Sequence, residues 1–202
     1  MPSFTSDWFS HNIPSWQKLF SDLKWDSLLP KTVVEVGSFE GRSTIWILSN
    51  LLHHPSSRLY CVDTFQAEIE GRKQDVGGLF ERFSANIRES PERNKVTVVR
   101  GESLELLNRL IAKKITTDFV YIDGSHLAPD VLQDLVLSFR ILKVGGLVIC
   151  DDYLWSMERP GAEDVLNSPK IAIDAFTTVY RRKLTIVPKQ SLYQLAFIKT
   201  AE

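Results

Sequence analysis

Several features that would assign this chain to a familiar class are scarce in its sequence. Only two cysteines occur, Cys61 and Cys150, and each lies inside an apolar, strand-like run. This placement is typical of small buried side chains rather than of a disulfide or a metal-binding pair. Basic and acidic residues nearly balance, with a formal net charge of −1. No general attraction to nucleic acid is therefore predicted.

Long apolar runs are also missing. No run approaches the ~18 residues that a membrane-spanning helix needs. The start of the chain, Met1 to Asp7, lacks the basic and apolar regions of a signal peptide. We therefore expect a cytoplasmic protein that has no membrane partner. The length of 202 residues and the hydrophobic share of 44% predict a single domain over residues 1–202 with a sizeable core.

A third glycine is absent from the loop that follows the first apolar run. Thr32 to Val36 leads into Gly37-Ser38-Phe39-Glu40-Gly41 and then directly into a helical pattern. Two glycines at this spacing let the backbone approach a ligand closely, and the N–H groups at a helix start favour electron-rich groups. A dinucleotide fingerprint would read Gly-x-Gly-x-x-Gly. The loop therefore predicts a nucleotide-type cofactor and argues against NAD.

Strand-like and helix-like runs alternate along the chain, which predicts an α/β fold with a parallel sheet covered by helices on both faces. Strands are expected at 32–37, 58–63, 96–100, 118–123, 146–151, 183–188 and 192–199, and helices at 42–52, 79–89, 103–113, 129–142 and 171–180. The short connection from Pro188 to Ser191 predicts an antiparallel hairpin. Gly145-Gly146 is interpreted as a helix stop, and 68–78 as a loop.

Three acidic residues directly follow two of the predicted strands: Asp123 in one case, Asp151 and Asp152 in the other. Like charges so close repel one another unless a cation intervenes. Three oxygen ligands with open positions suit Mg²⁺ or a similar divalent ion. The alternative is that Asp151 or Asp152 caps a loop or hydrogen-bonds the substrate directly.

His126 follows Asp123 by three residues. Imidazole titrates near working pH, so His126 is the candidate general base or substrate anchor, with Asp123 as the second candidate catalytic residue. The alternative is a histidine that caps the helix beginning near Pro129 or that faces solvent.

Candidate cofactor-binding residues lie at strand ends or at the helix starts that follow, where ligands bind in a doubly wound sheet. They are Glu35, Gly37, Ser38, Gly41, Ser43, Asp63, Gly101, Glu102, Ser103 and Asp123. A carboxylate such as that of Asp63 can accept both hydrogen bonds of a ribose diol, although a solvated strand end is the simpler alternative. Ser103 could equally cap the helix that follows it.

Four motifs in order resemble class I S-adenosylmethionine-dependent methyltransferases: Glu35-x-Gly37-x-x-x-Gly41, Asp63, Gly101-Glu102-Ser103 and Tyr121-Ile122-Asp123-Gly124. The resemblance spans residues 32–152. It is greatest to small bacterial tailoring enzymes of the macrocin and cephamycin type, and more distant to catechol O-methyltransferase. It implies a seven-stranded Rossmann-like sheet ending in an antiparallel hairpin, with S-adenosylmethionine as cofactor and Gly101-x-Ser103 against its adenine.

The resemblance also implies a divalent metal on Asp123, Asp151 and Asp152, although the last is an Asp where the catechol enzyme has Asn. His126 stands where that enzyme has its lysine base. The prediction is a metal-dependent O-methyltransferase of a small hydroxylated molecule. The alternatives are a metal-independent N-methyltransferase and a non-catalytic S-adenosylmethionine-binding protein. Residues 1–30 form either a lid or a helix that packs its Trp residues, and a homodimer rests on the resemblance alone.

Overall fold

The computed structural model describes residues 1–69, 72–74, 77–156, 158, 161, 164–188 and 191–202. Its contacts divide the chain into two compact units. Unit 1 comprises residues 1–32 and 37–102, and unit 2 comprises residues 33–36 and 103–202. Within the described residues, every helix is too short or too polar to span a membrane.

Unit 1 is built on two parallel strands, β2 (Arg58–Asp63) and β5 (Val96–Arg100), which pair so that Asp63 lies opposite Arg100. Its helices are α1 (Ile13–Asp22), α2 (Arg42–Leu51) and α3 (Leu79–Glu89), with 3₁₀ turns at Ser10–Asn12 and Arg93–Lys95. Two short strands, β3 (Ala67–Ile69) and β4 (Arg72–Gln74), pair antiparallel within the segment predicted to be a loop. Residues 70–71 and 75–76 of that segment lie outside the described residues.

The N-terminal segment carries a helix, as one of the two alternatives predicted. Trp16 of α1 is fully buried and makes edge contacts with Phe9 and with Trp46 of α2, at ring-centroid distances of 5.1 and 5.4 Å. Large aromatic rings contribute heavily to core energetics because each removes a large apolar area from water. The aromatic residues of this segment therefore anchor α1 to α2, and the role of residues 1–30 as a lid stays a prediction.

The described residues of unit 2 form five strands in the order β1-β6-β7-β9-β8. In chain order they are β1 (Thr32–Val36), β6 (Thr117–Ile122), β7 (Leu142–Cys150), β8 (Leu184–Ile186) and β9 (Leu195–Lys199). The first three are parallel, whereas β9 runs antiparallel to both β7 and β8. The predicted C-terminal hairpin is confirmed, with residues 189–190 of its connection outside the described ranges.

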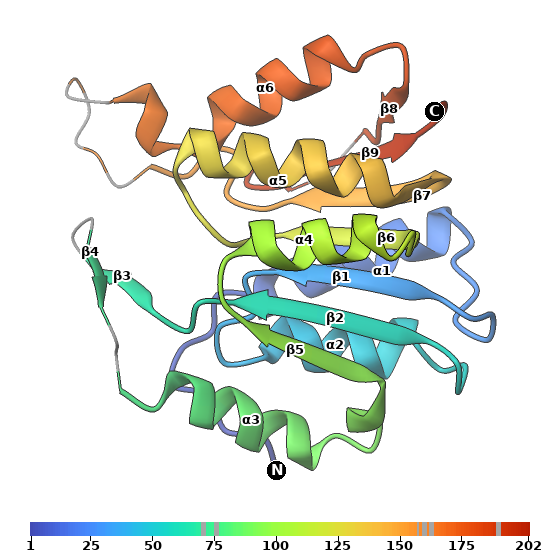
Figure 1. Ribbon diagram of the computed structural model, residues 1–202, viewed down its shortest axis with the longest axis vertical. Coiled ribbons are helices and arrows are strands. Elements are labelled where there is room, and N and C mark those ends of the chain that lie inside the picture. Colours follow the sequence, from blue (N-terminus) through green and yellow to red (C-terminus); the bar gives the residue numbers. More distant parts are fainter. Residues whose placement is uncertain (70–71, 75–76, 157, 159–160, 162–163, 189–190) are drawn as a thin grey trace. The chain divides into compact units, whose positions relative to one another are not determined.

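Three helices of unit 2 pack side by side, with α5 in the middle (Figure 1). They are α4 (Ser103–Ala112), α5 (Ala128–Ile141) and α6 (Pro169–Val179), and a 3₁₀ turn at Val165–Asn167 precedes α6. The predicted helix stop at Gly145-Gly146 is wrong. The helix ends at Ile141, and both glycines lie inside β7, where Gly145 has a φ of +85° next to a shift in the register between β6 and β7.

Candidate active site

The glycine loop, residues 37–41, connects β1 to α2. Gly37 and Gly41 have φ angles of +83° and +86°, a backbone region that side chains with a Cβ rarely adopt. A Cβ on Gly41 would also lie 3.1 Å from the ring of Phe83 in α3. Glycine is therefore required at position 41 both by the backbone and by the packing of α3, whatever the loop binds.

Asp63, at the end of β2, holds this loop in place. One carboxylate oxygen accepts hydrogen bonds from the backbone N–H groups of Ser38 and Phe39, both at 2.8 Å, and the other accepts from Phe65 at 2.5 Å. The carbonyl of Asp63 accepts from Gly101 N–H at 2.9 Å. The structure thus brings four predicted cofactor residues of unit 1 together: Gly37, Ser38, Asp63 and Gly101. Each carboxylate oxygen has two lone pairs, so these bonds leave capacity for a ribose hydroxyl.

Glu40 is a buried residue of the glycine loop that sequence reasoning missed. Its side chain is 1% exposed and accepts from the backbone N–H and hydroxyl of Thr5, both at 2.6 Å, and from Arg82 Nε at 2.7 Å. Burial alone would raise the pKa of Glu40, but the hydrogen bonds from Thr5 and the charge of Arg82 outweigh it and hold the pKa below its ordinary value. Its neighbour on the sequence, Phe39, stacks on Trp8 at 4.7 Å.

These contacts attach the first nine residues, which we call the N-terminal strap, to the glycine loop. Asn86 of α3 donates to the carbonyls of both Ser3 and Glu40, each at 2.9 Å. Hydrogen bonds to a buried carboxylate therefore attach the strap to the loop. Of the other candidates in unit 1, Ser43 is buried in the first turn of α2, and Glu102 is exposed after β5.

In unit 2, the pairing of the strands gathers acidic residues on one face of the sheet. Tyr121 pairs with Glu35 of β1 and with Ile149 of β7. Because side chains alternate along a strand, Tyr121, Asp123 and Asp151 share a face. The Tyr121 hydroxyl donates to Asp123 Oδ2 at 2.9 Å and also contacts Asp151 Oδ2. Tyr121 thus bridges two candidate residues, although sequence reasoning gave it no role.

The electrostatics of this face differ from those of Glu40. Burial raises the pKa of Asp123 well above its ordinary value, and the charges of Asp151 and Asp152 raise it further, against the hydrogen bond from Tyr121. The buried Glu35 adds to the same effect. Burial also raises the pKa of Asp151, which the hydrogen bonds from Tyr121 and Gln194 oppose. These carboxyl groups therefore take up protons, or a cation, more readily than exposed carboxyl groups do.

His126 is paired with Asp152, so the structure brings together two residues predicted for separate roles. Imidazole Nε2 lies 2.8 Å from Asp152 Oδ2, and the ring stacks on Trp155 with centroids 4.0 Å apart. Asp152 has a φ of +56°, a conformation that Asp tolerates better than most residues. This turn separates Asp152 from the Asp151 side chain, which bonds Tyr121 instead.

Ser103 starts α4, and its hydroxyl donates to the buried Asp134 of α5. Its predicted contact with the cofactor stays a prediction.

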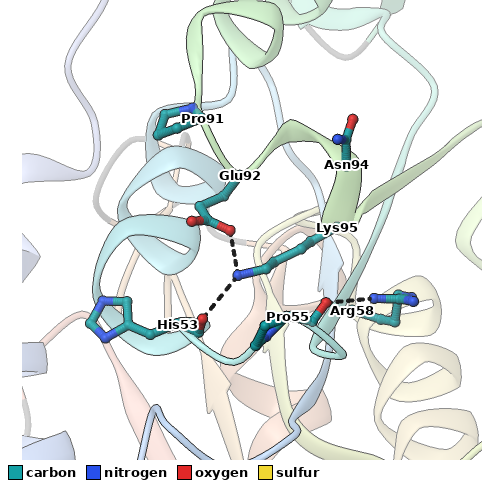
Figure 2. Close-up of a pocket in the computed structure, with 7 residues that line it drawn as sticks. All are labelled: His53, Pro55, Arg58, Pro91, Glu92, Asn94 and Lys95. Carbon is teal, nitrogen blue, oxygen red and sulfur yellow. Dashed lines mark hydrogen bonds and ion pairs between the residues drawn. The ribbon is translucent and has the colours of Figure 1, made fainter.

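A pocket of about 370 Å³ lies in unit 1, near the starts of β2 and β5 and thus at the opposite end of these strands from Asp63 (Figure 2). Lys95, which is 6% exposed, points across it and donates to the carbonyl of Leu52 at 2.5 Å, with Glu92 as its ionic partner. Arg58 donates to the carbonyl of Pro55 at 3.3 Å. Lys95 and Arg58 therefore donate to backbone carbonyls and stabilise the backbone around the pocket. The pocket lies away from the predicted motifs.

Comparison with known proteins decides the family. A model of the methyltransferase domain matches residues 34–153, more than half of the chain. The chain belongs to the methyltransferase domain family. The prediction of an S-adenosylmethionine-dependent methyltransferase from the four motifs is thereby confirmed, and the matched residues span all of them. No curated protein sequence matches this chain.

Solved structures share the fold of this methyltransferase. A protein of Klebsiella pneumoniae assigned as an O-methyltransferase has a TM-score of 0.71 at 17% identity, covering 98% of this chain and 84% of that one. The O-methyltransferase of Bacillus cereus, in complex with S-adenosylhomocysteine, has a TM-score of 0.68 at 18% identity, covering 97% and 84%. MycE of mycinamycin biosynthesis, in complex with Mg, S-adenosylhomocysteine and mycinamycin VI, has 0.62 at 14% identity, covering 97% and 51%. The predicted Rossmann-like methyltransferase fold is confirmed.

Proposed function

We propose that this methyltransferase moves the methyl group of S-adenosylmethionine to a hydroxyl group of a small acceptor molecule, with His126 as general base. The observation that carries the proposal is the 2.8 Å contact between Asp152 and the imidazole of His126. The complexes of the Bacillus cereus enzyme and of MycE with S-adenosylhomocysteine support the choice of cofactor.

The Asp152–His126 pair can accept the acceptor's proton. A carboxylate only accepts hydrogen bonds, so Nε2 carries the hydrogen in this pair, and the lone pair of the neutral ring lies on Nδ1. The hydroxyl proton moves to Nδ1 while the hydroxyl oxygen attacks the methyl carbon. S-adenosylmethionine, when bound, would supply the methyl group on a positively charged sulfur, and that sulfur would keep the electron pair of the broken carbon–sulfur bond. Asp152 then stabilises the imidazolium, and Trp155 restrains the plane of the ring.

The cofactor is proposed to bind the glycine loop, whose backbone geometry admits close approach of a ligand. The proposal keeps all predicted cofactor residues: Glu35, Gly37, Ser38, Gly41, Ser43, Asp63, Gly101, Glu102, Ser103 and Asp123. Within unit 1 it is supported by the hydrogen bonds that Ser38 and Gly101 donate to Asp63 through their backbone N–H groups. Because Asp63 already bonds the loop, we expect its removal to affect both the loop and the ribose.

A divalent cation such as Mg²⁺ is the second part of the proposal, favoured by the raised pKa of Asp123 and Asp151. Their oxygens fit a hard cation, which when bound would lower the pKa of a coordinated hydroxyl. Among the residues that the structure describes, no group of three or more His, Cys, Asp or Glu side chains is arranged to hold a metal. Asp123 and Asp151 would hold the ion, and Asp152 would join them only by releasing His126.

Calorimetry tests the cofactor and the cation separately. We expect S-adenosylhomocysteine to bind metal-free protein with a Kd of roughly micromolar size. Mg²⁺ should give a separate heat that Asp151→Asn abolishes. The matched control is Asp118→Asn, on the same sheet but paired with Lys143, which should keep that heat. No binding of the cofactor would overturn the proposal, and an Mg²⁺ heat unchanged by Asp151→Asn would overturn its metal part.

Turnover distinguishes the reaction types. With labelled S-adenosylmethionine and a panel of alcohols, phenols and amines, we expect O-methylated products by mass spectrometry, and a loss of turnover in chelator that Mg²⁺ reverses. Methylation of amines alone that is insensitive to chelator would favour the metal-independent N-methyltransferase. Cofactor binding without any turnover would favour a non-catalytic protein.

A further inference from the structure

A cleft in unit 2 adjoins the acidic residues. It has a volume of about 310 Å³ and lies between the loop after β7 and the β8–β9 hairpin. Tyr153 and Leu154 line it from the loop, and Ile186, Leu192 and Leu195 line it from the hairpin. We call it the hairpin cleft. Its volume is near the lower end of the range for small-molecule sites.

One polar side chain connects the hairpin cleft to the acidic residues. Gln194 lines the cleft, is 3% exposed, and donates through Nε2 to Asp151 Oδ2 at 2.9 Å. The backbone of Tyr153 donates to the carbonyl of Tyr193 at 2.9 Å, which joins the loop after β7 to the hairpin. A molecule in the cleft therefore reaches Asp151 across a single amide group.

The lining of the hairpin cleft is mostly apolar and carries no charge among its described residues. Leu192 is 75% exposed, Leu154 46% and Ile186 48%, so three large apolar side chains face solvent around one opening. An exposed cluster of large apolar side chains is typical of a binding surface. An anionic group placed here would lose hydration, and Lys170, the cation beside Tyr153, is already paired with Asp174.

We propose that the hairpin cleft binds the apolar part of the acceptor, and that the acceptor is an uncharged hydroxylated molecule with a ring or chain of low polarity. A sugar phosphate or a carboxylated acceptor is disfavoured. This inference rests on the proposed function, since it names the substrate class of the same site. Tyr153 keeps its side chain in place through its hydroxyl, which donates to Asp174 of α6 at 2.8 Å. One wall of the cleft is therefore preorganised.

The test uses three probes with protein saturated in S-adenosylhomocysteine: phenol, 2-naphthol and 6-hydroxy-2-naphthoate. By calorimetry, 2-naphthol should bind about tenfold more tightly than phenol, because its second ring adds apolar area to the contact. It should also bind about tenfold more tightly than the naphthoate, which keeps the hydroxyl but adds a charge. Equal affinities for all three probes would overturn the inference.

A matched pair of variants locates the binding. Leu192→Glu should weaken the binding of 2-naphthol about tenfold, whereas Val179→Glu, at a similarly exposed residue of α6, should leave it unchanged. Equal behaviour of the two variants would overturn the inference, as would a dimer that Leu192→Glu dissociates while 2-naphthol fails to bind. Failure of the proposed function is distinct, because S-adenosylhomocysteine would then not bind or no hydroxyl would be methylated.

Discussion

Two carboxyl groups of this methyltransferase, the buried Glu40 and the partly buried Asp123, have opposite electrostatics. Glu40 in unit 1 is surrounded by donors, from Thr5 and Arg82, and its pKa lies below the ordinary value. Asp123 in unit 2 accepts from Tyr121 but has three acids nearby, Asp151, Asp152 and Glu35, and its pKa lies well above the ordinary value. Burial disfavours the charged form in both places. The surrounding groups therefore decide whether a carboxylate stabilises the fold, as that of Glu40 does, or destabilises it, as that of Asp123 does beside the proposed catalytic residues.

The largest expected effect is on catalysis in unit 2. His126→Gln should lower kcat about 10²–10⁴-fold, because it removes the group that receives the proton. His126 is partly exposed, so the melting temperature and the affinity for S-adenosylhomocysteine should change little. The control is His11→Gln in an exposed part of unit 1, which should keep full activity. A kcat for His126→Gln within about threefold of the original would show that another group accepts the proton.

Glu40→Gln tests the stabilising carboxylate of unit 1. We expect the free energy of unfolding to fall by about 2–4 kcal/mol, since the substitution removes a charged acceptor from three buried or partly buried donors. Urea denaturation measures the loss. Glu89→Gln is the control, because its carboxylate binds the amino group of Met1 at an exposed site. An equal loss in the two variants would mean that the strap contributes no more than a surface contact.

The stability difference between the original protein and Glu40→Gln should depend on pH with a definite sign. A lowered pKa in the folded state gives stability that is present above the ordinary carboxyl pKa, about 4.3, and is lost as the pH falls through the folded value. The stability difference between the original protein and Glu40→Gln should therefore shrink below about pH 4. A difference that does not depend on pH would point to packing rather than charge.

Asp123→Asn should show the opposite sign and a smaller size. The raised pKa of Asp123 costs the folded state stability. The cost is complete at pH values above the raised pKa, falls as the pH drops, and disappears below the ordinary carboxyl pKa of about 4. We expect the variant to be more stable by about 1–2 kcal/mol at high pH, with the gain vanishing below about pH 4. Denaturation at several pH values measures this, and a variant that is less stable throughout would contradict the account.

Two glycines with the same backbone conformation sharpen the comparison of the units. Gly41 and Gly145 have φ angles of +86° and +85°, but a Cβ on Gly41 would lie 3.1 Å from Phe83, whereas a Cβ on Gly145 would meet nothing within 4 Å. Gly145→Ala should cost about 1 kcal/mol for the backbone alone. Gly41→Ala should cost about 1 kcal/mol more through crowding. Equal melting temperatures for the two variants would show that Phe83 moves aside at no cost.

The sequence predicted most elements because their signals are local. The bounds of α3 match the prediction, and those of α2 differ only at its last residue, since apolar spacing and the glycines before each helix mark both. The helix stop predicted at residues 145 and 146 was wrong because glycine with a positive φ occurs both at helix ends and at irregular points in strands. Only pairing with β6 distinguishes the two cases.

The sequence predicted which residues form the candidate site, but not which of them contact one another. The acids after β6 and β7 and His126 were identified from their places at strand ends. The bridge of Tyr121 could have been found, since it lies two residues before Asp123 on the same strand face. Gln194 and Glu40 gave no signal, because Gln194 lies 43 residues from Asp151 and Glu40 lies 35 residues from Thr5.

By itself, the sequence determined the order of the strands β1, β2 and β5 to β9 and of the helices from α2 to α6, the family and the kinds of side chain at the strand ends, because these depend on neighbours along the chain. Only the tertiary structure decided that Asp152 pairs with His126 and that Asp123 and Asp151 both contact Tyr121. It also decided that Glu40 bonds the N-terminal strap. The charge state of a buried carboxyl depends on the donors and charges within a few ångströms of it. Folding brings those groups together from distant parts of the chain, so no local pattern could reveal them.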